Sequence, residues 1–261
     1  MFAMGNILSF LPRIAMSASL VRRRFSDASA SYDAEAQAQR QIASRLWALA
    51  APYLPRSAAI LEIGAGTGLL TQHILSAQPS SLTVNDLYTS PQVQALMQQQ
   101  PGVLSCREGD AETLDFCGPF DAICSASTVQ WFADVKGFLR RCARYLPKGG
   151  LLAFSSFLPG NLHEVVELTG VGLDYPDAAT LQNYLEQDFN LVAMEQGEIT
   201  LDFASPHDVL LHLKHTGVTG IKSVGWNKRK YLAFVDGYTS RYSTGRGVRL
   251  TYRPVYVVAL R

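Results

Sequence analysis

The stretch LEIGAGTG, residues 61–68, decides how this chain of 261 residues folds. Glycine occupies positions 64, 66 and 68, directly after a short apolar run and before a segment that favours a helix. Glycine at such a strand-to-helix turn permits a tight bend and lets a ligand approach the backbone closely. A dinucleotide-binding G-x-G-x-x-G motif would need its third glycine at Leu69, and Glu62 would repel a pyrophosphate. The loop therefore favours a cationic or zwitterionic ligand.

Strands and helices alternate outward from this loop. Apolar strands are predicted at 58–63, 81–85, 103–107, 120–124 and 151–157, and helices at 33–51, 69–77, 91–99 and 134–145. This βα spacing is typical of a parallel sheet with helices on both faces. Beyond residue 159 we expect helices at 162–168, 178–187, 206–215 and 228–242, and single long strands near 191–203 and 248–260. The predicted architecture is a doubly wound, seven-stranded, Rossmann-like α/β sheet with a helical lid insertion.

The N-terminal residues differ in composition from the rest. Residues 1–26 contain four arginines and no acidic residue. Transit peptides have such a composition, and an overextended translation start is a further alternative. We expect residues 1–23 to form a mobile basic arm and residues 24–261 to form one domain, with lid segments near 160–188 and 205–245.

The charge is distributed unevenly, although the net charge is only +1. Residues 206–261 contain ten Lys and Arg against two Asp, a net charge of +8, which leaves −7 upstream. This asymmetry suggests an acidic partner, whether a nucleic acid, an acidic protein or a membrane surface, although a merely solvated face is the alternative. Every apolar run is broken before the ~18 residues that a membrane-spanning helix needs, so we expect no membrane span.

The four cysteines show no metal-ligand spacing. Cys106, Cys117, Cys124 and Cys142 form no C-x-x-C pair, and no histidine lies within a few residues of them. We therefore predict free thiols, as in a reducing cytoplasm, and no bound metal.

The order of the motifs resembles that of class I S-adenosylmethionine (SAM)-dependent methyltransferases. After E-x-G-x-G-x-G at 62–68, Asp86 in VNDL follows the second predicted strand, and GDAE at 109–112 follows the third. The resemblance implies SAM as cofactor, with Asp86 on the ribose hydroxyls, and Asp110 and an adjoining backbone amide on the adenine. The cofactor residues that it implies are Glu62, Gly64, Ala65, Gly66, Gly68, Asp86, Leu87, Asp110, Ala111 and Ser125.

The acceptor is predicted to be a carboxylate. Methyl displacement from a sulfonium mainly requires alignment in a dry site, and an ionised carboxylate needs no base. The chain has no N-P-P-Y or D-P-P-Y tetrapeptide of the kind associated with nitrogen acceptors. Gln39 in SYDAEAQAQ and Trp131 in SASTVQWF are similar to the anchors of small-molecule carboxyl methyltransferases. That resemblance implies that Gln39 and Trp131 hold the acceptor, and that Tyr32 lies near the methionine moiety or closes the site.

Four longer segments resemble one methyltransferase family more narrowly. They are RRRFSDASASYDAEAQAQRQIA at 22–43, VQWFAD at 129–134, SFLPGNLHEVVELTGVGLDYP at 156–176 and SPHDVLLHLKHTGV at 205–218. They are similar to the BioC family, the malonyl-[acyl-carrier protein] O-methyltransferases of biotin synthesis. One departure is Ala126, which follows Ser125 where the family often has Asn. The resemblance implies methylation of the free carboxylate of a malonyl thioester.

The implied partner is an acidic acyl carrier protein that carries a malonyl group, or malonyl-CoA, rather than a nucleic acid or a membrane. The basic C-terminal part matches such a carrier in charge. Lys214 and Arg24 are the candidate contacts to the carrier or its phosphopantetheine. His212 lies two residues from Lys214, so the two side chains are predicted to lie on different faces of one helix. A methyltransferase of another acceptor, such as a quinone, a small acid or an RNA base, and a SAM-binding regulator without turnover, are the alternatives.

Overall fold

The computed structural model describes residues 35–216 and 225–261. The expected basic arm, Arg24 and Tyr32 therefore lie outside the described residues.

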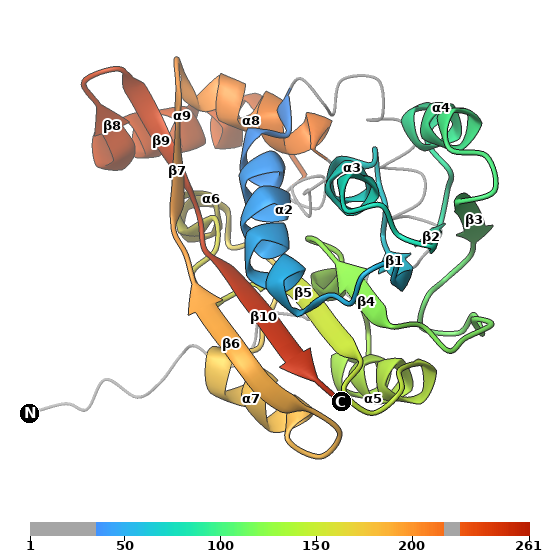
Figure 1. The fold of residues 1–261 in the computed structure, drawn as a ribbon. Helices are drawn as coiled ribbons and strands as arrows, with labels where there is room; N and C mark the ends of the chain where they lie inside the picture. The colour runs from blue at the N-terminus through green and yellow to red at the C-terminus, as the bar shows by residue number, and fades with distance from the viewer. Residues whose placement is uncertain (1–34, 217–224) are drawn as a thin grey trace, which may run out of the picture.

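A mixed seven-stranded sheet forms the centre of the fold (Figure 1), in the order β3-β2-β1-β4-β5-β10-β6. Its strands are β1 Ala59–Ile63, β2 Ser81–Asp86, β3 Leu104–Glu108, β4 Ala122–Ser125, β5 Leu151–Phe157, β6 Asn190–Gln196 and β10 Pro254–Leu260. All neighbouring pairs are parallel except those of β10, which is antiparallel to β5 and β6. The doubly wound α/β class is confirmed, and one strand runs against the parallel direction. The order reverses between β1 and β4, the point at which open α/β sheets bind ligands.

Helices cover both faces of this sheet, and a separate apolar core lies under each set. The helices α2 Gln37–Ala50, α3 Leu69–Ser76 and α4 Pro91–Gln99 share one core, whereas α5 Val135–Tyr145 and α7 Ala178–Leu185 share the other. Side chains alternate between the two faces along a strand. In β1, for example, Ile60 belongs to the first core, and Leu61 and Ile63 belong to the second.

The two long strands expected near 191–203 and 248–260 are each divided in two. Their outer parts are β7 Ile199–Phe203 and β9 Gly247–Tyr252, which form a small antiparallel sheet with β8 Ser243–Thr244. The two breaks lie next to each other in the folded chain, because the Gly197 N–H donates to the Pro254 carbonyl at 2.8 Å. Proline has no N–H for a ladder, and the N–H of Arg253 donates instead to Asn161 Oδ1 at 3.0 Å. The prediction of single strands was therefore wrong.

Three helices join the small sheet at one end of the molecule (Figure 1). They are α6 His163–Thr169, α8 Pro206–His215 and α9 Lys228–Tyr242, and α9 packs against both α6 and α8. We call this group the lid. By contrast, α7, which lies within the expected lid segment 160–188, packs on α5 and β6. Its Leu181 and Leu185 are buried in the core beneath α5, which explains this position.

The four cysteines are free, and burial raises the pKa of the Cys124 and Cys142 thiols to about 12. Within residues 35–216 and 225–261, no helix combines the length and the apolar character that crossing a bilayer would require. The same residues contain no cluster of three or more His, Cys, Asp or Glu suited to a metal ion.

Candidate active site

The glycine loop turns sharply between β1 and α3. The N–H groups of Gly64 and Ala65 both donate to the Asn85 carbonyl, at 2.8 and 3.0 Å. Gly64 has φ +74°, and a Cβ there would lie 2.0 Å from Thr128 Oγ1. Gly66 has φ +56°, and a Cβ there would meet no atom within 4 Å. Glycine at position 64 therefore permits close packing against the loop after β4, whereas position 66 faces open space.

Asp86 ends β2 beside this loop. Its Oδ2 accepts from the Gly66 N–H at 2.8 Å, and its Oδ1 accepts from the Tyr88 N–H at 3.4 Å. Burial raises the pKa of the Asp86 carboxyl, and these backbone donors oppose that rise. The carboxylate therefore stabilises the glycine loop as well as facing the cavity next to it.

Glu62 lies in β1 just below the glycine loop and is fully buried. Its Oε2 accepts from the Thr71 hydroxyl at 2.7 Å. Burial raises the pKa of the Glu62 carboxyl to about 8, and the charge of Asp86 adds to this rise. A cation close to Glu62 would favour the ionised carboxylate, because opposite charges lower the pKa of an acid.

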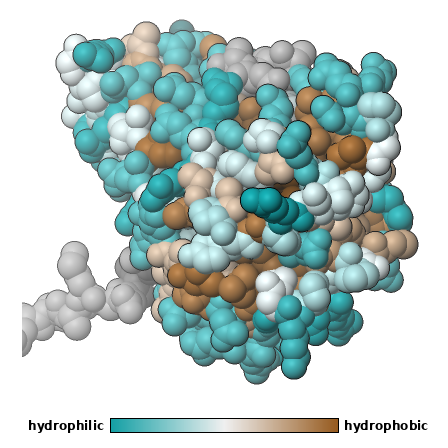
Figure 2. Space-filling view, in the orientation of Figure 1, coloured by the Kyte–Doolittle hydropathy of each residue, from teal (hydrophilic) through white to brown (hydrophobic). Residues whose placement is uncertain are grey.

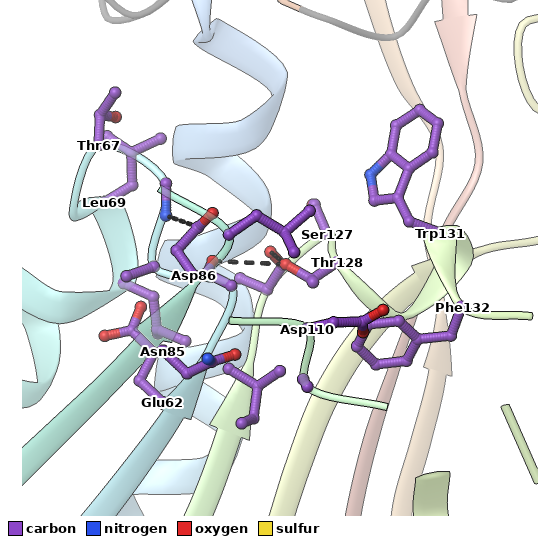
Figure 3. Close-up of a pocket in the computed structure, with 18 of the residues that line it drawn as sticks. Glu62, Thr67, Leu69, Asn85, Asp86, Asp110, Ser127, Thr128, Trp131 and Phe132 are labelled. Atoms are coloured by element: carbon purple, nitrogen blue, oxygen red, sulfur yellow. Dashed lines mark hydrogen bonds between the residues drawn. The ribbon is translucent and has the colours of Figure 1, made fainter. Parts of the chain in front are cut away.

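A cavity opens at the carboxyl ends of β1, β2 and β4, bordered by α2 and by the 3-10 helix η2 Val129–Trp131 (Figure 3). None of the described residues that line it is Lys, Arg or His. Four acids line it, and three further lining residues have a buried polar atom without a hydrogen-bond partner in the described chain: Gln39 Oε1, Thr67 Oγ1 and Ser127 Oγ. An acidic cavity with unused polar atoms suits a cationic, hydrogen-bonding ligand and would repel a pyrophosphate.

Most of the predicted cofactor residues line this cavity. They are Glu62, Gly64, Ala65, Gly66, Asp86, Leu87, Asp110 and Ala111. Ser125 and Gly68 do not. The Ser125 hydroxyl is buried and donates to the Ile63 carbonyl at 2.9 Å, so it supports the loop from below. Gly68 is the N-cap of α3 with φ +89°, and it lies against Leu96. Both residues shape the turn rather than the cavity wall.

The two predicted acceptor anchors line the same cavity, although 92 residues of sequence separate them. Gln39 extends from the first turn of α2 and is 5% exposed. Trp131 is half-buried at the end of η2, where its backbone N–H donates to the Thr128 carbonyl at 2.9 Å. Figure 3 shows the Trp131 indole across the cavity from Thr67, with its ring nitrogen facing the side on which Ser127 lies. The fold thus gathers two uncharged polar side chains beside the glycine loop.

Several lining residues were missed by the sequence analysis. Asn85 is buried before Asp86, and its Nδ2 donates to the carbonyls of Arg107 and Gly109 at 2.7 and 3.0 Å. Ser127 has φ +55°, an unfavourable backbone conformation for a residue other than glycine. Both residues lie inside quoted segments, VNDL and SASTVQWF, but the sequence analysis assigned a role only to their neighbours.

In the lid, His212 and Lys214 lie on different faces of α8, as predicted. The His212 side chain faces inward and is 2% exposed, whereas Lys214 is exposed. His212, and not Lys214, therefore faces the interior of the protein. The contact of Lys214 with a carrier stays a prediction.

Solved structures share this fold. A putative methyltransferase from Bacillus halodurans is similar with a TM-score of 0.60 and 16% identity, covering 84% of this chain and 97% of that one. The putative methyltransferase in a complex with the Haloferax volcanii Trm112 methyltransferase activator is similar with a TM-score of 0.57 and 20% identity, covering 91% of this chain and 96% of that one. A family described as a methyltransferase domain matches residues 61–154. Fold, cavity and family match define a class I SAM-dependent methyltransferase.

Relatives of higher sequence identity show which family within this class the chain belongs to. A malonyl-[acyl-carrier protein] O-methyltransferase from Haemophilus ducreyi is 38% identical, covering 94% of this chain and 98% of its own length. Enzymes of the same name from Haemophilus influenzae and Bacteroides thetaiotaomicron are 38% and 35% identical, covering 92% and 94% of this chain and 94% and 98% of their own. The chain belongs to the malonyl-[acyl-carrier protein] O-methyltransferase family.

Proposed function

We propose that this protein transfers a methyl group from SAM to the free carboxylate of a malonyl group carried on an acyl carrier protein, and so forms a methyl ester. The observation that carries the proposal is the position of Gln39 and Trp131, which line the acidic glycine-loop cavity in a chain of this family. Esterification removes the negative charge of the malonyl group. The capped thioester can then serve as a primer for the pimeloyl chain of biotin.

The cofactor half of the cavity suits SAM because its wall is acidic and the ligand carries a sulfonium and an ammonium group. Asp86 would accept from the ribose hydroxyls, and Asp110 with the Ala111 N–H would hold the adenine. Glu62 lies behind the loop, where a cationic ligand stabilises its ionised form. When bound, SAM supplies an electrophilic methyl carbon whose bond to sulfur breaks as the carboxylate oxygen attacks.

The acceptor half needs no general base. A malonyl carboxylate is ionised at neutral pH, so the nucleophile arrives without a proton. The Gln39 amide and the Trp131 indole N–H would each donate to it and hold it in line with the methyl group. Because both donors are uncharged, they withdraw less electron density from the attacking oxygen than an arginine would.

The lid has the charge that an acidic carrier protein requires. Among the described residues of α8, α9 and the small sheet, seven exposed cations are Lys214, Lys228, Arg229, Lys230, Arg241, Arg246 and Arg249. The end of the molecule that holds α9 and β8 is largely hydrophilic, at the upper left of Figure 2. Complementary charge increases the rate of encounter and orients the partner. Lys214 and Arg24 would contribute to this docking, in the cytoplasm where carrier proteins act.

Product analysis tests the proposal. The protein is incubated with methyl-labelled SAM and malonyl-carrier protein, beside malonyl-CoA, succinyl thioesters and free malonate. We expect label in a methyl ester that mild alkali releases, with the carrier-bound malonyl group as the best acceptor. Label on nitrogen or carbon, or SAM binding without any transfer, would contradict the proposal.

A matched substitution tests the acceptor anchor. Trp131→Phe keeps an aromatic ring but removes the indole N–H, so we expect turnover to fall by about tenfold or more while the Kd for SAM is unchanged. Steady-state kinetics and calorimetry measure the two quantities. Acceptor kinetics equal to those of the unsubstituted enzyme would remove the indole from the mechanism.

A further inference from the structure

A buried polar cluster connects the lid to the residue that precedes α2. The Nε2 of His212 in α8 lies 2.8 Å from the Tyr252 hydroxyl in β9. The Nδ1 of the same ring lies 3.6 Å from Glu35 Oε2. His212 is 2% exposed and Tyr252 is fully buried, whereas the Glu35 side chain is 41% exposed. Three segments far apart in the sequence therefore meet at one imidazole.

The hydrogen-bonding capacities of the imidazole, the carboxylate and the hydroxyl decide which ring nitrogen of His212 bears the hydrogen. A neutral imidazole has one N–H donor and one acceptor nitrogen, and a carboxylate can only accept. Nδ1 of His212 therefore bears the hydrogen and faces Glu35, whereas Nε2 accepts from the Tyr252 hydroxyl. Burial is the largest cause that lowers the pKa of His212, and His215 lowers it further, against the opposing effect of Glu35. At neutral pH the uncharged ring satisfies both partners.

The cluster lies at the start of the helix that carries an acceptor anchor. Glu35 directly precedes Ala36, the N-cap of α2, and Ala36 provides no side-chain hydrogen bond to the helix. The first turn of α2 also contains no acidic residue. Gln39 lies in that turn and is directed into the cavity wall. The position of Glu35 therefore bears directly on where α2 begins and where the Gln39 amide lies.

We propose that His212 is a positioning residue for the methyl acceptor: it connects Glu35 to Tyr252 and thereby holds the start of α2, and with it Gln39, against the lid. This inference deepens the proposed function and rests on it. The Phe203 ring of β7, whose centroid lies 4.9 Å from that of His212, closes the apolar side of the cluster. Neither His212 nor Glu35 lines the SAM cavity, so the effect acts on the acceptor rather than on the cofactor.

Two substitutions of His212 separate its two contacts. The amide of His212→Asn occupies the place of Nδ1 and preserves the contact with Glu35, whereas the amide of His212→Gln reaches the place of Nε2 and preserves the contact with Tyr252. Each variant loses one contact, so a purely structural role predicts similar effects of both on stability and catalysis. The proposal predicts that His212→Gln raises the KM for the malonyl thioester about tenfold, because a small misplacement of a binding group weakens alignment. It predicts a KM within about twofold of the original for His212→Asn.

A double-mutant cycle with Glu35→Ala completes the experiment. We expect Glu35→Ala to raise the KM as much as His212→Gln does, and the double variant to show no further rise. The Kd for SAM stays unchanged throughout.

Three results would overturn the inference: equal KM values for His212→Gln and the unsubstituted enzyme, additive effects of His212→Gln and Glu35→Ala, or a loss of thermal stability without any change in KM. Failure of the proposed function is distinguishable, because the unsubstituted enzyme would then form no methyl ester from any malonyl thioester.

Discussion

Asp86 makes one contact with the protein, and the proposed function adds a second contact, with the cofactor. It accepts from the Gly66 N–H in the structure, and the proposed function gives it the ribose hydroxyls as well. An asparagine can still accept from the Gly66 N–H through its amide oxygen, but it lacks the charge that strengthens bonds to hydroxyls. Substitution with asparagine and with alanine therefore separates the two contacts.

We expect Asp86→Asn to weaken SAM binding about tenfold and Asp86→Ala to weaken it further, because alanine also releases the glycine loop. Titration calorimetry gives both Kd values. An unchanged Kd for Asp86→Ala would exclude the carboxylate from the cofactor site.

The raised pKa of Glu62 predicts that a proton is released when the cofactor binds. Its pKa of about 8 lies well above the ordinary value of a carboxyl, so at pH 7 the side chain is mostly protonated. A bound cation lowers this pKa, so Glu62 gives up its proton and the affinity for SAM rises with pH until about pH 8. We expect up to about one proton released per SAM at pH 7, and less at pH 9 where Glu62 is already ionised.

Calorimetry in buffers of different ionisation enthalpy measures the number of protons released. Glu62→Gln is the control and should abolish the release. If this variant releases as many protons as the unsubstituted enzyme, the proton comes from another group.

At the scale of elements, α6 is attached to β9 by a buried carboxylate. Glu164 is fully buried, and its two oxygens accept from the Thr251 hydroxyl at 2.6 Å and from the Thr251 N–H at 3.2 Å. Its neighbours are His163, at 3.5 Å, and Arg249, at 3.9 Å. Removing the carboxylate would leave buried polar groups of Thr251 without a partner.

We expect Glu164→Ala to lower the free energy of unfolding by about 3 kcal/mol, the cost of two lost bonds to a carboxylate together with an unsatisfied buried group. Urea unfolding followed by circular dichroism measures this change. Glu186→Ala, at an exposed position just beyond α7, is the matched control and should change stability by less than about 0.5 kcal/mol. Equal unfolding midpoints for the two variants would show that α6 is held by apolar packing alone.

For the whole molecule, the distribution of charge gives a prediction about salt. If the lid cations dock the carrier, reversing two of them in Lys228→Glu/Arg229→Glu should raise the KM for malonyl-carrier protein roughly tenfold at low salt. The same variant should lose most of its dependence on ionic strength, because screening acts on the removed attraction.

A small uncharged thioester, malonyl-N-acetylcysteamine, reports on the catalytic site without the carrier, and its KM should not change. Lys148→Glu, an exposed substitution outside the lid, is the control variant. A KM for the carrier substrate that is insensitive to both salt and charge reversal would leave the lid cations without a role in docking.

Much of the fold could be predicted because it depends on local patterns. Four predicted elements match the structure at both ends, among them α4 at 91–99 and β5 at 151–157, where a proline or a glycine pair marks a boundary. The long strands could not be divided in the same way. Their breaks depend on a contact between Gly197 and Pro254, which lie 57 residues apart and become neighbours only in the folded sheet.

The functional site, like the fold, could be predicted only in part. The glycine loop and Asp86 can be found from spacing, since each lies at the carboxyl end of a predicted strand. Ser125 is the last residue of β4 and Ser127 lies two residues further on, yet the first supports the backbone of β1 and the second lines the cavity. The direction of each side chain depends on the turn after β4, and no local pattern reveals it.

By itself, then, the amino-acid sequence determined the α/β class and the acidic glycine loop, because periodicity and motif spacing are local properties of the chain. Tertiary structure alone decided the reversed strand β10, the inward position of His212 and the placement of Gln39 and Trp131 on the wall of one cavity. These features arise from packing between distant segments, where burial and hydrogen bonding are settled only once the whole sheet has formed.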